Sequence, residues 1–166
     1  MIDKEAHLYT LENPDGTKAF VKSHKKGKIS NKDFQSLKKY LTEISNDQLN
    51  FDKNIVINYI DKDPTQASQN YQVPWDIFSG HMSDDLKAIA PTNHLWLIHK
   101  NVENLHYYHG DKINWIVDKD SLMRKSFFEY ADLNGGFIII KPTGTYFLRV
   151  GEFGKRELID TYKEFK

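Results

Sequence analysis

The chain contains no cysteine. This absence excludes disulfide bonds, thiolate metal sites and any reaction in which a thiol is the nucleophile. Long hydrophobic runs are also absent, because no stretch approaches the roughly 20 apolar residues of a membrane-spanning helix. Residues 1–5 carry charges where a signal peptide would have its apolar run. We therefore expect a soluble protein that is cytoplasmic as written, or periplasmic or secreted if a signal peptide was removed.

An excess of charge of one sign is lacking too, since 23 lysines and arginines balance 23 aspartates and glutamates. A general nucleic-acid or polyanion binder is therefore not expected. The charge is nevertheless uneven, because residues 18–39 hold eight lysines and one acid, Asp33. Hydrophobic residues make up 39% of the 166 positions, which is enough for the core of one domain, and no repeat or linker divides the chain.

Residues 1–50 predict a hairpin and a helix that precede the core as an extension. The turn of the hairpin is Asn-Pro-Asp-Gly at residues 13–16, where Gly16 can take the positive φ that a bulged hairpin needs. After Ser30, a good N-cap, apolar residues at helical spacing predict a helix over residues 31–45. The basic run between hairpin and helix, residues 22–28, is interpreted as a loop.

Residues 51–166 predict the core of the domain. Three runs are apolar on both faces, as in strands that helices cover on both sides of a sheet: 54–60, 95–98 and 137–140. The first two are expected to be parallel, because the chain between them is long enough for a helical crossover. The other expected elements are a helix capped by Ser83, an irregular stretch 101–117, a helix 119–130 capped by Asp118 or Asp120, a half-exposed strand 145–150 and a helix 155–165.

This order of strands and helices resembles the thioredoxin-like fold over roughly residues 54–165. The closest likeness lies in the last part, where a helix, a strand, the turn Pro142-Thr143-Gly144, a second strand and a final helix follow one another. The resemblance implies an α/β fold with a mixed sheet and helices on both faces. The ending is also similar to that of lysine- and asparagine-rich proteins of Bacteroidetes-type bacteria, which implies a bacterial origin.

Both hallmarks of a thioredoxin-like active site are missing. Enzymes of this family carry a reactive cysteine just after the first core strand, where this chain has residues 63–68. They tend to place a cis-proline just before the third core strand, where this chain has Asn134-Gly135-Gly136. The resemblance therefore implies a redox-inactive member that is not a thiol–disulfide oxidoreductase, and we expect no cofactor.

Aromatic side chains concentrate in two long segments that follow the first two core strands, residues 61–78 and 101–115. Tyrosine and tryptophan are enriched at protein interfaces. The candidate partner-binding residues are these rings and two lysines of the basic run: Tyr71, Trp75, Tyr107, Tyr108, Trp115, Lys25 and Lys26. The alternative is that the rings fill the core. We predict a non-catalytic module that binds another protein.

An enzyme that depends on a metal or a small ligand, and that uses Asp61, Asp63 and nearby histidines, is the alternative function. Asp61 and Asp63 follow a buried strand, at the edge where open α/β sheets bind ligands, although turn chemistry also explains them. His106, His109 and Asp111 are weak metal candidates, because residues three apart on a strand point to opposite faces. We therefore predict no metal site. No Ser-His-Asp arrangement stands at a diagnostic spacing.

Overall fold

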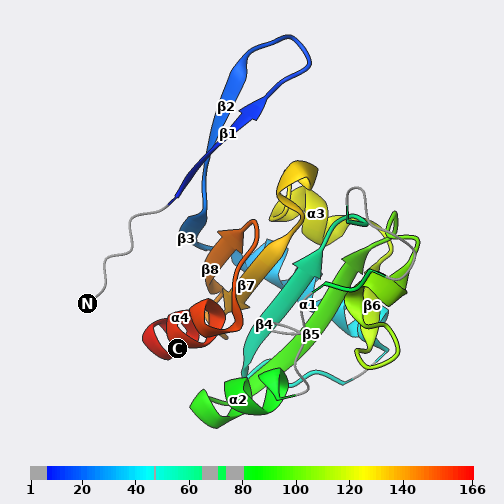
Figure 1. Cartoon of the computed structure of the whole chain (residues 1–166). Helices are drawn as coiled ribbons and strands as arrows, with labels where there is room; N and C mark the ends of the chain where they lie inside the picture. Colours follow the sequence, from blue (N-terminus) through cyan, green and yellow to red (C-terminus); the bar gives the residue numbers. More distant parts are fainter. Residues whose placement is uncertain (1–6, 47, 65–70, 74–80) are drawn as a thin grey trace.

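The computed structural model describes residues 7–46, 48–64, 71–73 and 81–166. A six-stranded mixed sheet forms its centre, with strands β3 (His24–Lys28), β4 (Asn54–Ile60), β5 (Thr92–His99), β6 (Trp115–Asp118), β7 (Gly136–Ile140) and β8 (Thr145–Val150). Their order across the sheet is β3-β8-β7-β4-β5-β6 (Figure 1). β4 and β5 are parallel, which confirms the prediction, and β6 is parallel to β5. The remaining neighbours are antiparallel.

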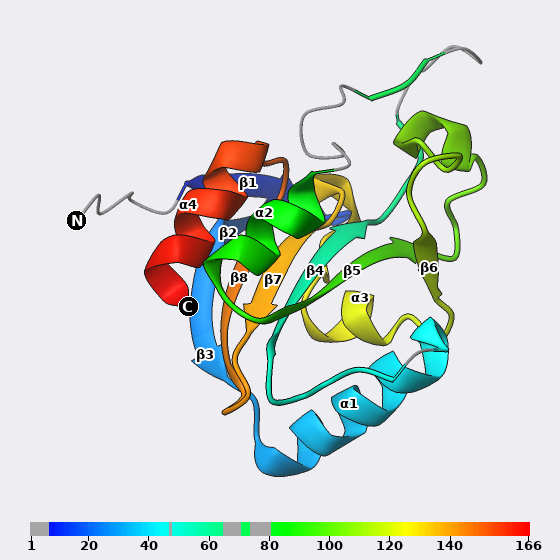
Figure 2. The same cartoon turned by 90° about the horizontal axis from the view of Figure 1, so that it is seen from below.

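Helices cover both faces of this sheet, as the doubly apolar strands predicted. α1 (Asn31–Ser45) and α3 (Leu122–Ser126) lie on one face, and α2 (Met82–Ile89) and α4 (Lys155–Phe165) lie on the other (Figure 2). Alternate residues of β4 feed the two cores, so that Ile57 packs with Leu41 on the α1 face and Val56 packs with Leu158 on the α4 face. None of the helices in the described ranges is long and apolar enough to cross a membrane.

The N-terminal hairpin projects from the body as a two-stranded arm (Figure 1). Its strands are β1 (Leu8–Glu12) and β2 (Lys18–Lys22), and Gly16 has a φ of +84° in the turn, as expected. Tyr9 and Val21 pack against the main core. The extension is therefore joined to the core at the base of the arm, and its next segment, β3, completes the central sheet.

Both edge strands of the sheet correct a sequence expectation. The basic run interpreted as a loop forms β3, which pairs with β8, and part of the stretch expected to be irregular forms β6. Lysines dominate β3, and Val117 in the middle of β6 is exposed. Edge strands of this kind lack the continuous apolar run that marks the interior strands, because helices do not enclose them on both faces.

Three other expectations also need correction. α3 is shorter than residues 119–130, because the chain turns after Ser126 and stacks the buried Phe128 on Tyr59 at a centroid distance of 4.7 Å. Ser83 is not the N-cap of α2, since the helix begins one residue earlier and the Ser83 hydroxyl contacts His94. β8 is buried over its last three residues, where Arg149 bonds to Glu157 of α4 at 2.7 Å.

Candidate functional site

Polar residues form a row where the three parallel strands end. Asp61 directly follows β4. The last residue of β4 pairs with Ile98 of β5. The residue after Ile98 in β5 is His99, which pairs with Asp118 of β6. Ligands of open α/β sheets bind outside this carboxyl edge. The sequence predicts Asp61 and Asp63 here, with histidines nearby, but it does not connect Asp118 with them. The register of the sheet is what brings Asp61, His99 and Asp118 into one row.

Asp61 is held by Arg124 in a buried ion pair. Its carboxylate is 3% exposed, and Oδ2 lies 3.3 Å from Nε of Arg124. Burial raises the pKa of Asp61, and the charge of Arg124 opposes this rise. His99 lies beside the pair, donates from Nε2 to Ser121 Oγ at 3.0 Å and accepts from the N–H of Asn101 at Nδ1. Burial, and then Arg124, lower the pKa of His99, so this imidazole is neutral in the cluster.

Asp118 ties together four elements of the fold. Its carboxylate accepts hydrogen bonds from the hydroxyls of Tyr40 in α1 and Tyr59 in β4, the latter at 2.8 Å. It also accepts from the N–H groups of Met123 and Arg124 at the start of α3, although the residue at the N-cap position of this helix is Ser121 and not, as expected, Asp118 or Asp120. Burial and the bond to Asp118 raise the pKa of Tyr40, and burial and the charge of Asp118 raise that of Tyr59. These groups position the end of β6.

The described parts of the two long segments, residues 61–78 and 101–115, meet at this edge. Val73 donates its N–H to the carbonyl of Tyr107 at 2.9 Å, and His109 donates from Nε2 to the carbonyl of Val73 at 2.8 Å. Asp63 accepts from the N–H groups of Glu103 and Asn104 at 3.2 and 3.4 Å. The carboxylate of Asp63 therefore holds the second segment in place.

Asn134 connects the segment after β4 to the segment before β7. Its Oδ1 accepts from the N–H groups of Asp61 and Lys62 at 3.1 and 2.9 Å, and its Nδ2 donates to the Tyr108 hydroxyl at 3.3 Å. The backbone of Gly135 passes so close to β4 that an added Cβ would lie 2.0 Å from the carbonyl oxygen of Tyr59. Gly135 also has a φ of +83°, a backbone conformation that residues with a side chain rarely adopt. For both reasons, glycine is the residue that fits at this position.

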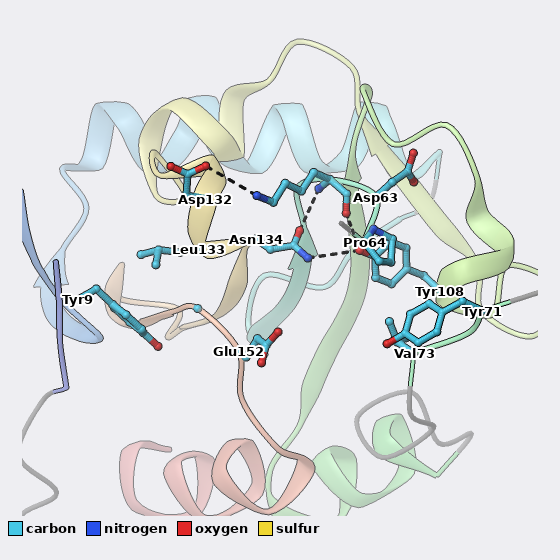
Figure 3. Close-up of a pocket in the computed structure, with 12 residues that line it drawn as sticks. Tyr9, Asp63, Pro64, Tyr71, Val73, Tyr108, Asp132, Leu133, Asn134 and Glu152 are labelled. Atoms are coloured by element: carbon cyan, nitrogen blue, oxygen red, sulfur yellow. Dashed lines mark hydrogen bonds and ion pairs between the residues drawn. The ribbon is translucent and has the colours of Figure 1, made fainter. Parts of the chain in front are cut away.

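A cleft of about 560 Å³ opens beside these contacts (Figure 3). Its lining combines tyrosine rings, three carboxylates and a few small or apolar groups, contributed by Tyr9, Lys62, Asp63, Pro64, Tyr71, Val73, Tyr108, Asp132, Leu133, Asn134, Gly151 and Glu152. Lys62 and Asp132 form a loose ion pair at 3.8 Å across one side. The cleft thus draws on the segments after β4 and β8 and on the segment before β7.

The candidate partner-binding residues occupy different positions. Tyr71 is 40% exposed and its ring lies 6.4 Å from the half-buried ring of Tyr107. Tyr108 is 2% exposed and donates to the carbonyl of Lys62, so its ring fills the core, which was the alternative for this residue. Trp115 is half-buried and donates to the carbonyl of Tyr108. Trp75 lies outside the described residues. Lys25 and Lys26 are exposed on β3, away from these rings.

No group of three or more histidine, aspartate or glutamate side chains is arranged to hold a metal ion in the described part of the chain. His106 and Asp111 are exposed, whereas His109 is buried and bonded to Val73. The weak metal candidates are therefore not brought together. Asp61 and Asp63, the residues of the alternative enzyme, are engaged by Arg124 and by backbone N–H groups.

A row of hydrogen-bonded side chains lies under α2: a serine, a histidine and an asparagine. The sequence alone does not connect these three residues. Ser83 Oγ lies 2.5 Å from Nδ1 of His94, and Nε2 of His94 lies 2.6 Å from Oδ1 of the buried Asn58. Burial lowers the pKa of His94 to about 3. An imidazole with this pKa is a weak general base at neutral pH. These three hydrogen-bonded side chains therefore connect α2 to β5 and β4.

No protein-family model and no curated protein matches the chain. Among solved structures, it is similar to the pneumococcal exposed lipoprotein thioredoxin of Streptococcus pneumoniae strain TIGR4, at 11% identity and a TM-score of 0.40, over 96% of this chain and 100% of that one. It is also similar to BsSco, a member of the Sco family of cytochrome c oxidase assembly proteins, at 13% identity and a TM-score of 0.36, over 98% of this chain and 94% of that one. Scores this low carry no argument by themselves.

The fold is assigned from the sheet. From β4 onward the elements follow in the predicted order, and the strands lie in the order β8-β7-β4-β5 with the predicted parallel pair. The fold is thioredoxin-like. Of the residues at which the resemblance expects a thiol (63–68) and a cis-proline (134–136), Asp63, Pro64 and Asn134 line the cleft, and residues 65–68 lie outside the described residues. The chain has no cysteine to place there.

Proposed function

We propose that the protein is a redox-inactive, thioredoxin-like interaction module of a bacterium, which binds another protein at the cleft beside β4 and β7. The observation that carries this proposal is the cleft itself. It lies where the fold would hold a redox centre, yet its lining offers tyrosine rings and carboxylates, and the chain has no thiol. A surface of this composition is suited to binding a partner without thiol exchange.

The rim of the cleft supports binding by a preformed surface. The bonds of Val73 to Tyr107 and His109, and of Asp63 to the second segment, fix the backbone under the rings of Tyr71 and Tyr107. Tyrosine adds a large contact area on binding for a small loss of side-chain entropy. We expect these two rings to be the contact residues of the aromatic set, with Tyr108 and Trp115 beneath them as support.

Site-specific photo-crosslinking tests this proposal. Replacement of Tyr71 by p-benzoylphenylalanine should yield, after irradiation in bacterial cells, a discrete adduct with one protein. The same probe at Val117, which is 47% exposed on β6, is the matched control and should not yield that adduct. The adduct protein, once purified, should bind the parent chain and lose affinity for Tyr71→Ala/Tyr107→Ala, mainly through faster dissociation.

Two results would overturn the binding role of the cleft. One is the same set of adducts from both probe positions, which would mean random collision. The other is a folded Tyr71→Ala/Tyr107→Ala variant that binds the captured protein as tightly as the parent does. The urea unfolding midpoint of the Tyr71→Ala/Tyr107→Ala variant, compared with that of the parent, shows whether the variant is folded.

A further inference from the structure

A second concave surface lies on the α3 side of the sheet, at its β3 edge. We call it the lysine groove. It has a volume of about 530 Å³ between β3 and α3, and a neighbouring hollow of about 320 Å³ shares its Phe127 and Tyr146. Leu148 and Val150 of β8 are buried at its base. The groove therefore has an apolar floor.

The rim of the lysine groove is strongly basic. Lys22, Lys25 and Lys26 line it, and Glu129 is its one acidic lining residue among those described. None of these three lysines forms an ion pair with a described residue, although eight lysines and a single acid occupy residues 18–39. An unneutralised basic rim around an apolar floor is complementary to a segment that carries both carboxylates and apolar side chains.

The backbone of β3 adds a third element of recognition. β3 is an edge strand, and no described strand pairs with its outer side. An edge strand presents a row of N–H and C=O groups that an extended segment can pair with. Lysines on such an edge disfavour pairing with a second copy, because two β3 edges would bring like charges together. An acidic segment has the opposite preference.

We propose that the lysine groove binds an acidic, extended segment of a partner protein, whose backbone lies along β3 and whose apolar side chains enter the groove. This surface is separate from the cleft of the proposed function, so either site can fail without the other. Phe20 and Tyr130, exposed at 65% and 39%, also line the groove and provide the apolar contacts that a nucleic acid backbone would not use.

Fluorescence anisotropy with synthetic peptides tests the lysine groove. The probe is a labelled twelve-residue peptide in which glutamate alternates with leucine, and one matched peptide has serine for leucine while another has lysine for glutamate. We expect the Glu-Leu peptide to bind and both matched peptides to bind at least about tenfold more weakly. N-methylation of alternate amides of the Glu-Leu peptide should also weaken binding, because it removes strand-pairing donors.

Variants locate the binding surface. Lys25→Glu/Lys26→Glu should weaken binding of the Glu-Leu peptide about tenfold or more, since the rim then repels it. Lys39→Glu/Lys163→Glu, which changes the same charge at exposed positions of α1 and α4, should weaken it no more than about twofold. Phe20→Ala/Tyr130→Ala should weaken it without a change of charge. Tyr71→Ala/Tyr107→Ala should leave it unchanged.

The proposal is overturned by any of three results. Equal loss in the two charge-reversed variants would mean that only net charge matters. Equal affinity for the Glu-Leu and Glu-Ser peptides would mean that the groove is not used. An oligonucleotide of the same charge that binds as tightly as the Glu-Leu peptide would make the surface a general polyanion patch.

Discussion

Removal of the cation in the buried ion pair at the end of β4 should destabilise the protein strongly. Arg124→Met keeps most of the apolar stem of the side chain but leaves the carboxylate of Asp61 without its partner. That carboxylate is 3% exposed, and its Oδ2, 3.3 Å from Arg124 Nε, has no hydrogen-bond partner among the described residues. A buried charge that loses its counter-ion keeps its desolvation cost, so the change acts on a group that water cannot easily reach.

The expected loss follows from the burial of the two partners. Breaking a buried ion pair costs about 3–5 kcal/mol. Because Arg124 is 31% exposed, solvent screens part of the interaction, and we expect about 3 kcal/mol, or a Tm lower by roughly 6–12 °C. Arg156→Met is the matched control, since Arg156 pairs with Asp160 across one helical turn and is 95% exposed. It should cost less than about 0.5 kcal/mol.

The loss should depend on pH with a definite sign. Burial raises the folded-state pKa of Asp61 above its unfolded value. The ionised carboxylate therefore lowers the stability of the fold by its full amount at pH values above the folded pKa, and it has no such effect at pH values below the unfolded pKa. Without Arg124 this folded pKa rises further. Arg124 also lowers the pKa of His99, and its removal makes a proton on His99 less costly at low pH. The deficit of Arg124→Met relative to the parent should therefore shrink from about pH 7 to about pH 4.

Urea unfolding followed by tryptophan fluorescence measures these differences at each pH. Asp61→Asn/Arg124→Met removes the buried charge together with its partner and should recover most of the loss at neutral pH. The reasoning is refuted if Arg124→Met costs no more than Arg156→Met. It is also refuted if the double variant is as unstable as Arg124→Met at every pH, because the loss would then come from packing and not from charge.

Three further predictions concern the thiol-free chemistry, the backbone and a buried histidine. The purified protein should not catalyse the reduction of insulin by dithiothreitol, because thiol exchange needs a thiolate nucleophile and the chain has no cysteine; turnover above the blank in a preparation free of reductases would contradict this. Gly135→Ala should cost at least about 3 kcal/mol in urea unfolding, and Gly16→Ala should cost only about 1 kcal/mol. Both glycines have a φ near +84°, but only at Gly135 would the added Cβ lie 2.0 Å from a carbonyl oxygen. Similar losses would show that this close approach is not present in solution. The ring signals of His94 in NMR spectra should stay constant from about pH 8 to about pH 5, because burial lowers the pKa of His94 to about 3. The fold should lose stability as the pH falls below the pKa of His94 in the unfolded chain, near 6.5. A titration midpoint near 6.5 in the folded protein would contradict the buried link between His94 and Asn58.

The interior of the fold could be predicted from the sequence because burial on both faces leaves a continuous apolar run. β4, β5 and β7 show such runs, and the spacing of Phe34, Leu37 and Leu41 marks the buried face of α1. The edges could not be predicted in the same way. β3 is held by backbone pairing to β8, which leaves no signal in side chains that are mostly lysine.

The contacts that build the cleft could be predicted only in part. The parallel pair placed both aromatic segments at one edge, and Val73 and Tyr107 do meet there. Asn134 Oδ1 accepts a hydrogen bond from the N–H of Lys62, a residue 72 positions away in the sequence. The sequence around Asn134 does not indicate this partner. An asparagine before two glycines is typical of a turn, and this local pattern does not indicate the bonds that Asn134 forms.

The residues around the cleft explain how a thioredoxin-like fold can keep a defined surface without thiols. In this chain a side-chain amide, that of Asn134, holds the segment after β4 against the segment before β7. The carboxylate of Asp63 holds the second aromatic segment, and that of Asp118 holds the end of β6. Each of these three groups accepts hydrogen bonds from backbone or hydroxyl donors, so the backbone around the cleft is held in one arrangement. A surface that is ordered in this way loses little conformational entropy when it binds a partner, as proposed here.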